Sequence, residues 1–244
     1  MLSETQLLAR MDALTQTWEA RADRRATFLR CYRMMTANML AAIARGEFAD
    51  PAWVERLLHR FADYYFVALE AHEQAPATAP VVWQLAFAAT RQPQTTALQL
   101  LLLGVNAHIN YDLVLTLEDL LQPDWAGLSP GQREARYADH SQVNAIIGRT
   151  IDAVQDQILE PAMPGLDWLD QVLGPVDELL ISRVITHWRE GVWRHAGRLL
   201  EAASPGQRAE LVSAVEHDAV RLGEFILLRP AGGLRQDSLT TGGR

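Results

Sequence analysis

The segment LLLLGVNAHINYDLVLTL, residues 100–117, decides how the rest of the chain is organised. At about 100° of rotation per residue, its aliphatic side chains occupy every side of a helix. A helix that is apolar on all sides must be covered on all sides, so we expect a buried central helix over about 95–121. Buried polar groups are costly unless they are hydrogen-bonded. The segment nevertheless carries four polar residues that need an explanation: Asn106, His108, Asn110 and Asp112.

Helical periodicity extends along most of the chain, and no convincing alternating strand pattern is found. Three helix starts combine a capping side chain with a following proline, at Asp50–Pro51, Ser129–Pro130 and Ser204–Pro205. We therefore predict an all-α fold, a single bundle of about eight helices around the buried central helix. The helical domain is expected to span residues 1–229. Residues 230–244 have little to bury and are expected to form a disordered tail.

The composition indicates a soluble protein with an ample core. The chain has 244 residues, of which 49% are hydrophobic, and its formal net charge is −8. This acidic balance disfavours nucleic acid as a partner, because phosphate binding needs a basic face. The uninterrupted apolar runs are shorter than the roughly 20 residues that span a bilayer, and the N-terminus lacks the pattern of a signal peptide. With one cysteine, Cys31, we expect a cytoplasmic protein whose partner is a small-molecule substrate or ligand.

His108 and Asp112 are four residues apart, so their side chains share one face of the central helix. The pair suits two ligands of one divalent metal such as zinc, an imidazole nitrogen and a carboxylate oxygen. It equally suits a catalytic histidine that its own carboxylate holds in one tautomer, a general base for a substrate. The third interpretation is structural, because a buried polar pair also fixes the register of helix packing.

Asp63 and His140 are predicted to complete a metal site with His108 and Asp112. Asp63 lies in a very apolar neighbourhood, which favours its burial, and His140 lies near a helix start. The four side chains would supply nitrogen and oxygen ligands to one ion. The histidines that sit among charges are expected at the surface: His59, His72, His195 and His217.

Arg183 and His187 share one face of a late helix and are predicted as catalytic groups. In this role Arg183 would hold an anionic part of the substrate. The side chains predicted to bind the substrate are those of Asn106, Asn110, Asn144 and Tyr64.

Several segments resemble the bacterial domain-of-unknown-function family 5995. The most specific is NAHINYDL at 106–113, followed by the GEFADPAW junction at 46–53 and the RxxxHWREGVW helix at 183–193. The resemblance covers most of residues 18–200. It implies an all-α domain and no assigned reaction, so it strengthens the architecture and leaves the function open.

A more distant likeness joins LLLGVNAHINYDL to the helical zinc-dependent phospholipase C superfamily. That resemblance implies zinc-binding roles for His108 and Asp112 alone. The chain departs from the superfamily elsewhere, because the nearest second pair, His187 and Glu190, is spaced by three residues. A trinuclear zinc site is therefore not expected, and the alternatives left open are a mononuclear or a dinuclear site.

Two functions follow from these patterns. The first is a small-molecule enzyme that uses the His108–Asp112 pair. With a metal, it would hydrolyse an ester or phosphoester. Without a metal, His108 would move a proton on a small, fairly apolar substrate. The second is a non-catalytic ligand-binding or scaffold protein, in which the Asn and His–Asp pairs are structural.

Overall fold

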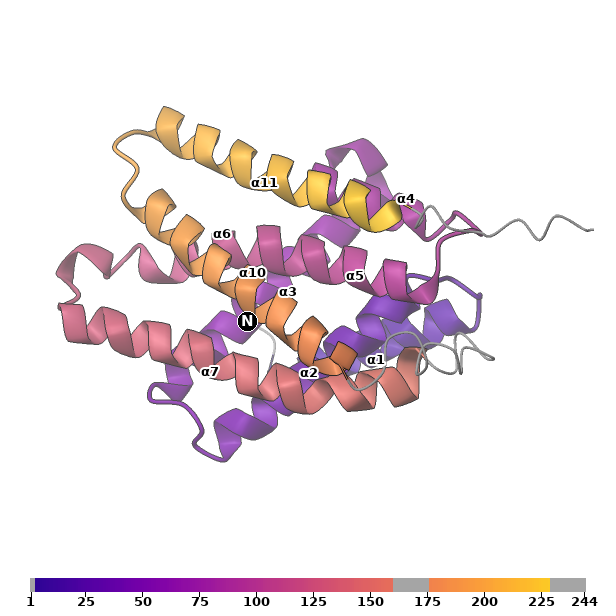
Figure 1. Cartoon of the computed structure of the whole chain (residues 1–244), viewed down its shortest axis with the longest axis horizontal. Helices are drawn as coiled ribbons and strands as arrows, with labels where there is room; N and C mark the ends of the chain where they lie inside the picture. Colours follow the sequence, from indigo (N-terminus) through magenta and orange to yellow (C-terminus); the bar gives the residue numbers. More distant parts are fainter. Residues whose placement is uncertain (1–2, 160–175, 229–244) are drawn as a thin grey trace, which may run out of the picture.

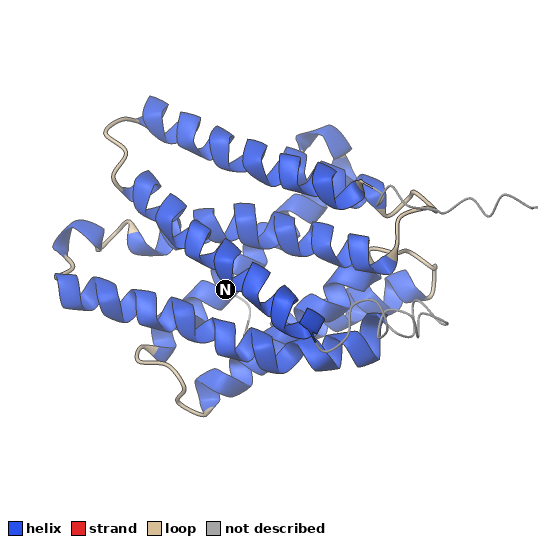
Figure 2. Ribbon diagram, in the orientation of Figure 1, coloured by secondary structure: helices blue, strands red, loops and turns tan. Residues whose placement is uncertain are grey.

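The structure is a computed structural model that describes residues 3–159 and 176–228, and all regular structure in these ranges is helical (Figures 1 and 2). The predicted all-α fold is therefore confirmed. The predicted tail at 230–244 lies outside the described residues. The helices are α1 (Glu4–Glu19), α2 (Ala26–Ala44), α3 (Pro51–Gln74), α4 (Val81–Ala89), α5 (Ala97–Ala107), α6 (Leu113–Leu121), α7 (Pro130–Val154), α10 (Val176–Leu200) and α11 (Pro205–Leu227). Short helical turns are η1 (Pro76–Thr78), η2 (His108–Asp112), η3 (Trp125–Gly127) and η4 (Gln155–Leu159).

The three predicted helix starts are confirmed. The Asp50 side chain accepts a hydrogen bond of 2.9 Å from the backbone N–H of Trp53, and Pro51 is the first residue of α3. The hydroxyls of Ser129 and Ser204 accept in the same way from the backbone N–H three residues later, at the starts of α7 and α11. These side chains satisfy N–H groups that have no partner within the helix.

The predicted central helix is present, but its middle turn is wider than an α-helix. Residues His108–Asp112 form the π-helical turn η2, which joins α5 to α6. The backbone N–H of Leu113 donates to the carbonyl of His108, five residues earlier. Such π turns are rare and frequently occur at functional sites. The interruption falls on the polar part of the segment and leaves the apolar parts α-helical.

Neighbouring helices surround this central run (Figure 1). Helix α11 packs against α5 on one side, α10 crosses α6 and α7, and α2 lies between α5 and α7. Helix α3 contacts α6, and α4 contacts α5. The polar turn η2 therefore lies in the interior, where α3, α10 and α11 all reach it.

Among the helical segments that the structure describes, Ala97–Leu121 is long and apolar enough to cross a membrane by length and composition. In this fold, 78% of its most apolar window is buried inside the chain. The surrounding helices thus cover the apolar surface that the sequence pattern predicts to be covered.

Candidate functional site

His108 and Asp112 form a direct pair inside the protein. The Nδ1 of His108 lies 2.9 Å from Oδ2 of Asp112, and both side chains are almost completely buried. The indole Nε1 of Trp83, on α4, donates to both carboxylate oxygens of Asp112, at 3.2 and 3.0 Å. The hydroxyl of Thr116 donates to the Asp112 carbonyl at 2.8 Å. The pair is thus held in one orientation by a second helix.

The second nitrogen of the imidazole lacks such a partner in the described parts of the chain. His108 Nε2 is buried, and no described residue forms a hydrogen bond with it. The Phe61 ring stacks on the imidazole, with ring centroids 3.5 Å apart and planes at 6°. The Tyr32 ring meets the imidazole edge-on at 4.4 Å, and the Tyr32 hydroxyl is also buried, with no partner in hydrogen-bond geometry among the same residues. An unpaired buried polar atom costs about 1–3 kcal/mol, so two of them in one place call for an explanation.

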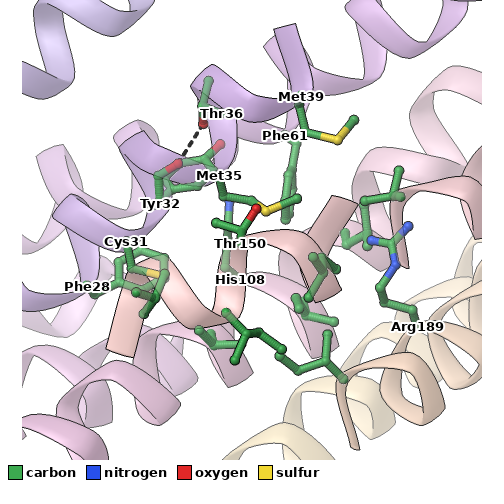
Figure 3. Close-up of a pocket in the computed structure, with 18 of the residues that line it drawn as sticks. Phe28, Cys31, Tyr32, Met35, Thr36, Met39, Phe61, His108, Thr150 and Arg189 are labelled. Carbon is green, nitrogen blue, oxygen red and sulfur yellow. Dashed lines mark hydrogen bonds between the residues drawn. The ribbon is translucent and has the colours of Figure 1, made fainter. Parts of the chain in front are cut away.

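His108 and Tyr32 line an apolar cavity of about 190 Å³ (Figure 3). The cavity lies among α2, α3, α5, α6, α7 and α10, and Figure 3 shows His108 at the centre of the residues drawn. Its walls are almost entirely aliphatic, aromatic and thioether side chains, among them Phe28, Met35, Met39, Leu57, Leu58, Phe61, Leu101, Leu102, Val105, Ile109, Val143, Ile147 and Ile185.

The other hydroxyls of the cavity wall are satisfied. Thr36 donates to the Tyr32 carbonyl at 2.8 Å, and Thr150 donates to the Ile146 carbonyl at 2.7 Å. Burial raises the pKa of the Cys31 thiol to about 12, so this cysteine stays protonated and unreactive. Among the described residues, the fully buried polar side-chain atoms of the wall that lack a partner are thus those of His108 and Tyr32.

Burial also sets the protonation of the pair. It lowers the pKa of the His108 imidazole well below its ordinary value, so the ring is neutral at pH 7. It raises the pKa of the Asp112 carboxyl well above its ordinary value, while the hydrogen bond from Trp83 acts in the opposite direction. When Nδ1 carries the proton of the neutral ring, it donates that proton to Oδ2 of Asp112. Nε2 is then the atom through which the pair can exchange a further proton.

The two asparagines of the central helix face a different neighbour. Asn106 Nδ2 donates to the Ala219 carbonyl of α11 at 2.8 Å, and Asn110 Nδ2 donates to Asn106 Oδ1 at 2.9 Å. Asn106 is fully buried. Neither residue lines the cavity. These two residues, which were predicted to bind the substrate, instead form hydrogen bonds that connect the central helix to α11.

The four predicted metal ligands do not come together. Within residues 3–159 and 176–228, no group of three or more His, Cys, Asp or Glu side chains could hold a metal ion. Asp63 is exposed, contrary to its predicted burial. His140 is buried on α7, where its Nε2 lies 3.1 Å from the Arg189 carbonyl. In the described ranges, the His108–Asp112 pair therefore has no third His, Cys, Asp or Glu beside it to complete a metal site.

The remaining predicted site residues lie apart from the cavity wall. Arg183 and His187 are exposed on α10. The Tyr64 hydroxyl donates to Asp119 at 2.8 Å, and Arg60 binds the same carboxylate.

Two of the histidines predicted to lie at the surface are buried: His59 and His72. For these two residues the prediction of exposure was wrong.

Arg189 is a residue of the cavity wall that sequence analysis missed. It is 4% exposed and lines the cavity on α10. Its Nε donates a hydrogen bond of 2.8 Å to Oδ1 of Asn144. Asn144, which the sequence predicted to bind the substrate, thus accepts from Arg189. A signal was present in the sequence, because Arg189 continues the spacing of the buried apolar stripe of α10: Ile185, Val192, Ala196 and Leu199.

Fold and site together define an all-α protein with a buried His–Asp pair beside an apolar cavity. The chain belongs to a family of unknown function, DUF5995, whose model matches residues 5–229. This match confirms the first resemblance noted in the sequence and gives no support to the likeness to zinc-dependent phospholipase C. No curated protein and no solved structure matches the chain.

Proposed function

We propose that the protein encloses a small, largely apolar molecule in the cavity, and that His108, oriented by Asp112, exchanges a proton with a polar group of that molecule. The observation that carries this proposal is the unpaired Nε2 of His108 in an otherwise apolar wall. Ligand sites are typically apolar cavities with a few placed polar groups. A ligand in contact with His108 and Tyr32 would satisfy two atoms that the protein leaves without partners.

The two unpaired atoms are complementary. Burial raises the pKa of Tyr32 well above its ordinary value, so its hydroxyl stays protonated and acts as a donor. When Nδ1 carries the imidazole proton and donates it to Asp112, Nε2 is an acceptor. Together they suit a hydroxyl group, which accepts from Tyr32 and donates to His108.

The pair also suits proton transfer in a dry site. Uptake of a proton at Nε2, with the Nδ1 proton passing to Oδ2, converts a pair of charge −1 into a neutral one. A surrounding of low polarity favours the neutral form. The stack on Phe61 and the hydrogen bond from Trp83 keep the imidazole oriented without using Nε2. The proposal needs no metal ion and replaces the predicted metal-assisted hydrolysis.

Benzene and phenol test the proposal, because they differ by one hydroxyl group. A dry apolar cavity of about 150 Å³ is large enough for benzene. By calorimetry, the wild type should bind both and should bind phenol about tenfold more tightly, as expected for hydrogen bonds worth about 1.4 kcal/mol in total. Tyr32→Phe should weaken phenol binding about threefold to tenfold and leave benzene binding unchanged.

Tyr65→Phe is the matched control, since Tyr65 is also buried but does not line the cavity. It should leave the affinities for both probes unchanged. Equal affinities for benzene and phenol in the wild type would contradict the role of the polar atoms. Failure to bind either probe would contradict the cavity as a ligand site.

A further inference from the structure

Arg189 places a charged group in the wall of the apolar cavity. We infer that its guanidinium binds the carboxylate of the ligand, and that the ligand is therefore a small amphipathic acid whose apolar body fills the cavity. This inference rests on the proposed function to the extent that both require a ligand in the same cavity. It adds the chemical class of that ligand, which His108 and Tyr32 alone do not define.

The hydrogen bonds of Arg189 leave one side of the guanidinium open. Its Nε donates to Asn144 Oδ1 at 2.8 Å, and its Nη2 donates to the His140 carbonyl at 2.6 Å and lies 3.3 Å from His140 Nδ1. These contacts use three of the five N–H donors of the side chain. Among the residues that the structure describes, Nη1 has no hydrogen-bond partner. Two donors of a fixed, planar group thus remain for a ligand.

The protein partners of Arg189 do not balance its charge. Asn144 is neutral, and burial and the nearby guanidinium hold the pKa of His140 well below its ordinary value. Within the described parts of the chain, Arg189 forms no direct ion pair with a carboxylate; the charge of the neighbouring Glu190 acts on it from a distance, and Glu190 itself accepts from the Tyr137 hydroxyl at 2.7 Å. Burial lowers the pKa of Arg189 to about 10, which still leaves it charged at pH 7. A buried charge of this kind is stabilised by an anion that pairs with it.

The chemistry of the site favours a carboxylate over a phosphate. One guanidinium supplies one positive charge and two free donors, which match the single charge and two oxygens of a carboxylate. A phosphate would bring up to two charges and a third oxygen. Among the described residues that line the cavity, none but Arg189 carries a positive charge to meet them.

The cavity wall defines the rest of the ligand. Figure 3 shows Arg189 at one end of the drawn residues and Phe28 and Cys31 towards the other, with His108 between them. A chain that leaves the guanidinium must therefore cross an apolar space that passes the imidazole. Because about 150 Å³ admits benzene, which has six non-hydrogen atoms, a cavity of about 190 Å³ has room for roughly eight non-hydrogen atoms in all, the carboxylate included. A medium-chain carboxylic acid fits this description.

Hexanoate and 1-hexanol provide the test, as they share a chain length and differ in charge. At pH 8, isothermal titration of the full chain should give a dissociation constant at least tenfold lower for hexanoate than for 1-hexanol. Hexanoate should also displace phenol, which places both ligands in one cavity. Arg189→Met should abolish the preference for hexanoate. The control is Arg183→Met, an exposed arginine on the same helix, which should retain the preference.

The outcomes separate the two proposals. If hexanoate and 1-hexanol bind equally well to the wild type, the role of Arg189 is overturned while the cavity remains a ligand site. If a folded Arg189→Met protein keeps the preference, or if Arg183→Met loses it, the role of Arg189 is likewise overturned. If neither compound binds, both proposals fail. Should Arg189→Met not fold, the comparison of the two compounds on the wild type decides the question.

Discussion

The indole N–H of Trp83 donates to both carboxylate oxygens of Asp112, at 3.2 and 3.0 Å, while Oδ2 of the same carboxylate lies 2.9 Å from His108 Nδ1. Trp83 stands 29 residues before Asp112 in the sequence and belongs to α4. The His–Asp pair is therefore a three-residue arrangement in which a second helix fixes the carboxylate. Its only free polar atom among these contacts is His108 Nε2.

Trp83→Phe should destabilise the protein by about 1–3 kcal/mol beyond the loss of packing, because it leaves the Asp112 carboxylate with one donor fewer in a buried place. Trp53→Phe is a matched control. Both tryptophans are almost fully buried, but the Nε1 of Trp53 has no hydrogen-bond partner to lose. Chemical denaturation measures both changes in the free energy of unfolding. Equal losses in the two variants would show that the Trp83 hydrogen bond contributes nothing.

Gly104→Ala should destabilise the protein although alanine is the better helix former. A Cβ at Gly104 would lie 2.4 Å from ring atoms of Phe28, so the ring would have to move. Overpacking of this kind costs about 1–3 kcal/mol. Gly191→Ala, in α10, is the control, since its Cβ would meet nothing within 4 Å. That variant should gain up to about 1 kcal/mol, and thermal unfolding of the two proteins checks the opposite signs. A stabilised Gly104→Ala protein would show that Phe28 yields at no cost.

Stability should fall as the pH drops below about 6.5, the ordinary pKa of histidine in an unfolded chain. Burial and the charge of Arg189 hold the pKa of His140 well below that value in the folded protein. The unfolded chain therefore binds more protons in this range, and stability rises with pH by up to about 1.4 kcal/mol per pH unit for this group. Protonation at Nδ1 would also face the guanidinium, 3.3 Å away.

The variant His140→Gln should have a shallower dependence of unfolding free energy on pH between about 5 and 6.5 than the wild type. The control is His217→Gln, which changes an exposed histidine of α11. It should keep the slope of the wild type. An unchanged slope in His140→Gln would contradict the lowered pKa in the folded protein.

The sequence was sufficient to predict what depends on local pattern. An apolar surface on all sides of 95–121 predicted burial, and the spacing of His108 and Asp112 predicted their contact. Asp50 and Ser204 were recognisable as caps because capping depends on neighbours within three residues. Each of these features is decided by residues that lie close together along the chain.

The partners of the site depend on how distant helices pack, which periodicity does not determine. The contact of Trp83 with Asp112 and that of Arg189 with the cavity belong to this class. Asp63 was predicted to be buried but is exposed. Its apolar neighbours in the sequence point to other faces of α3 and leave the carboxylate in solvent. The π turn at 108–112 likewise had no recognised pattern, since its side chains also fit an α-helix.

The nitrogen NMR signals of the His108 ring, followed while phenol is added, test the central claim most directly. The free protein should show a neutral imidazole, and saturation with phenol should shift the Nε2 signal of His108. The ring of His140, whose two nitrogens already have partners at 3.1 and 3.3 Å, should not respond. A His108 Nε2 signal that stays in place at saturating phenol would contradict the claim that this atom serves a ligand in the cavity.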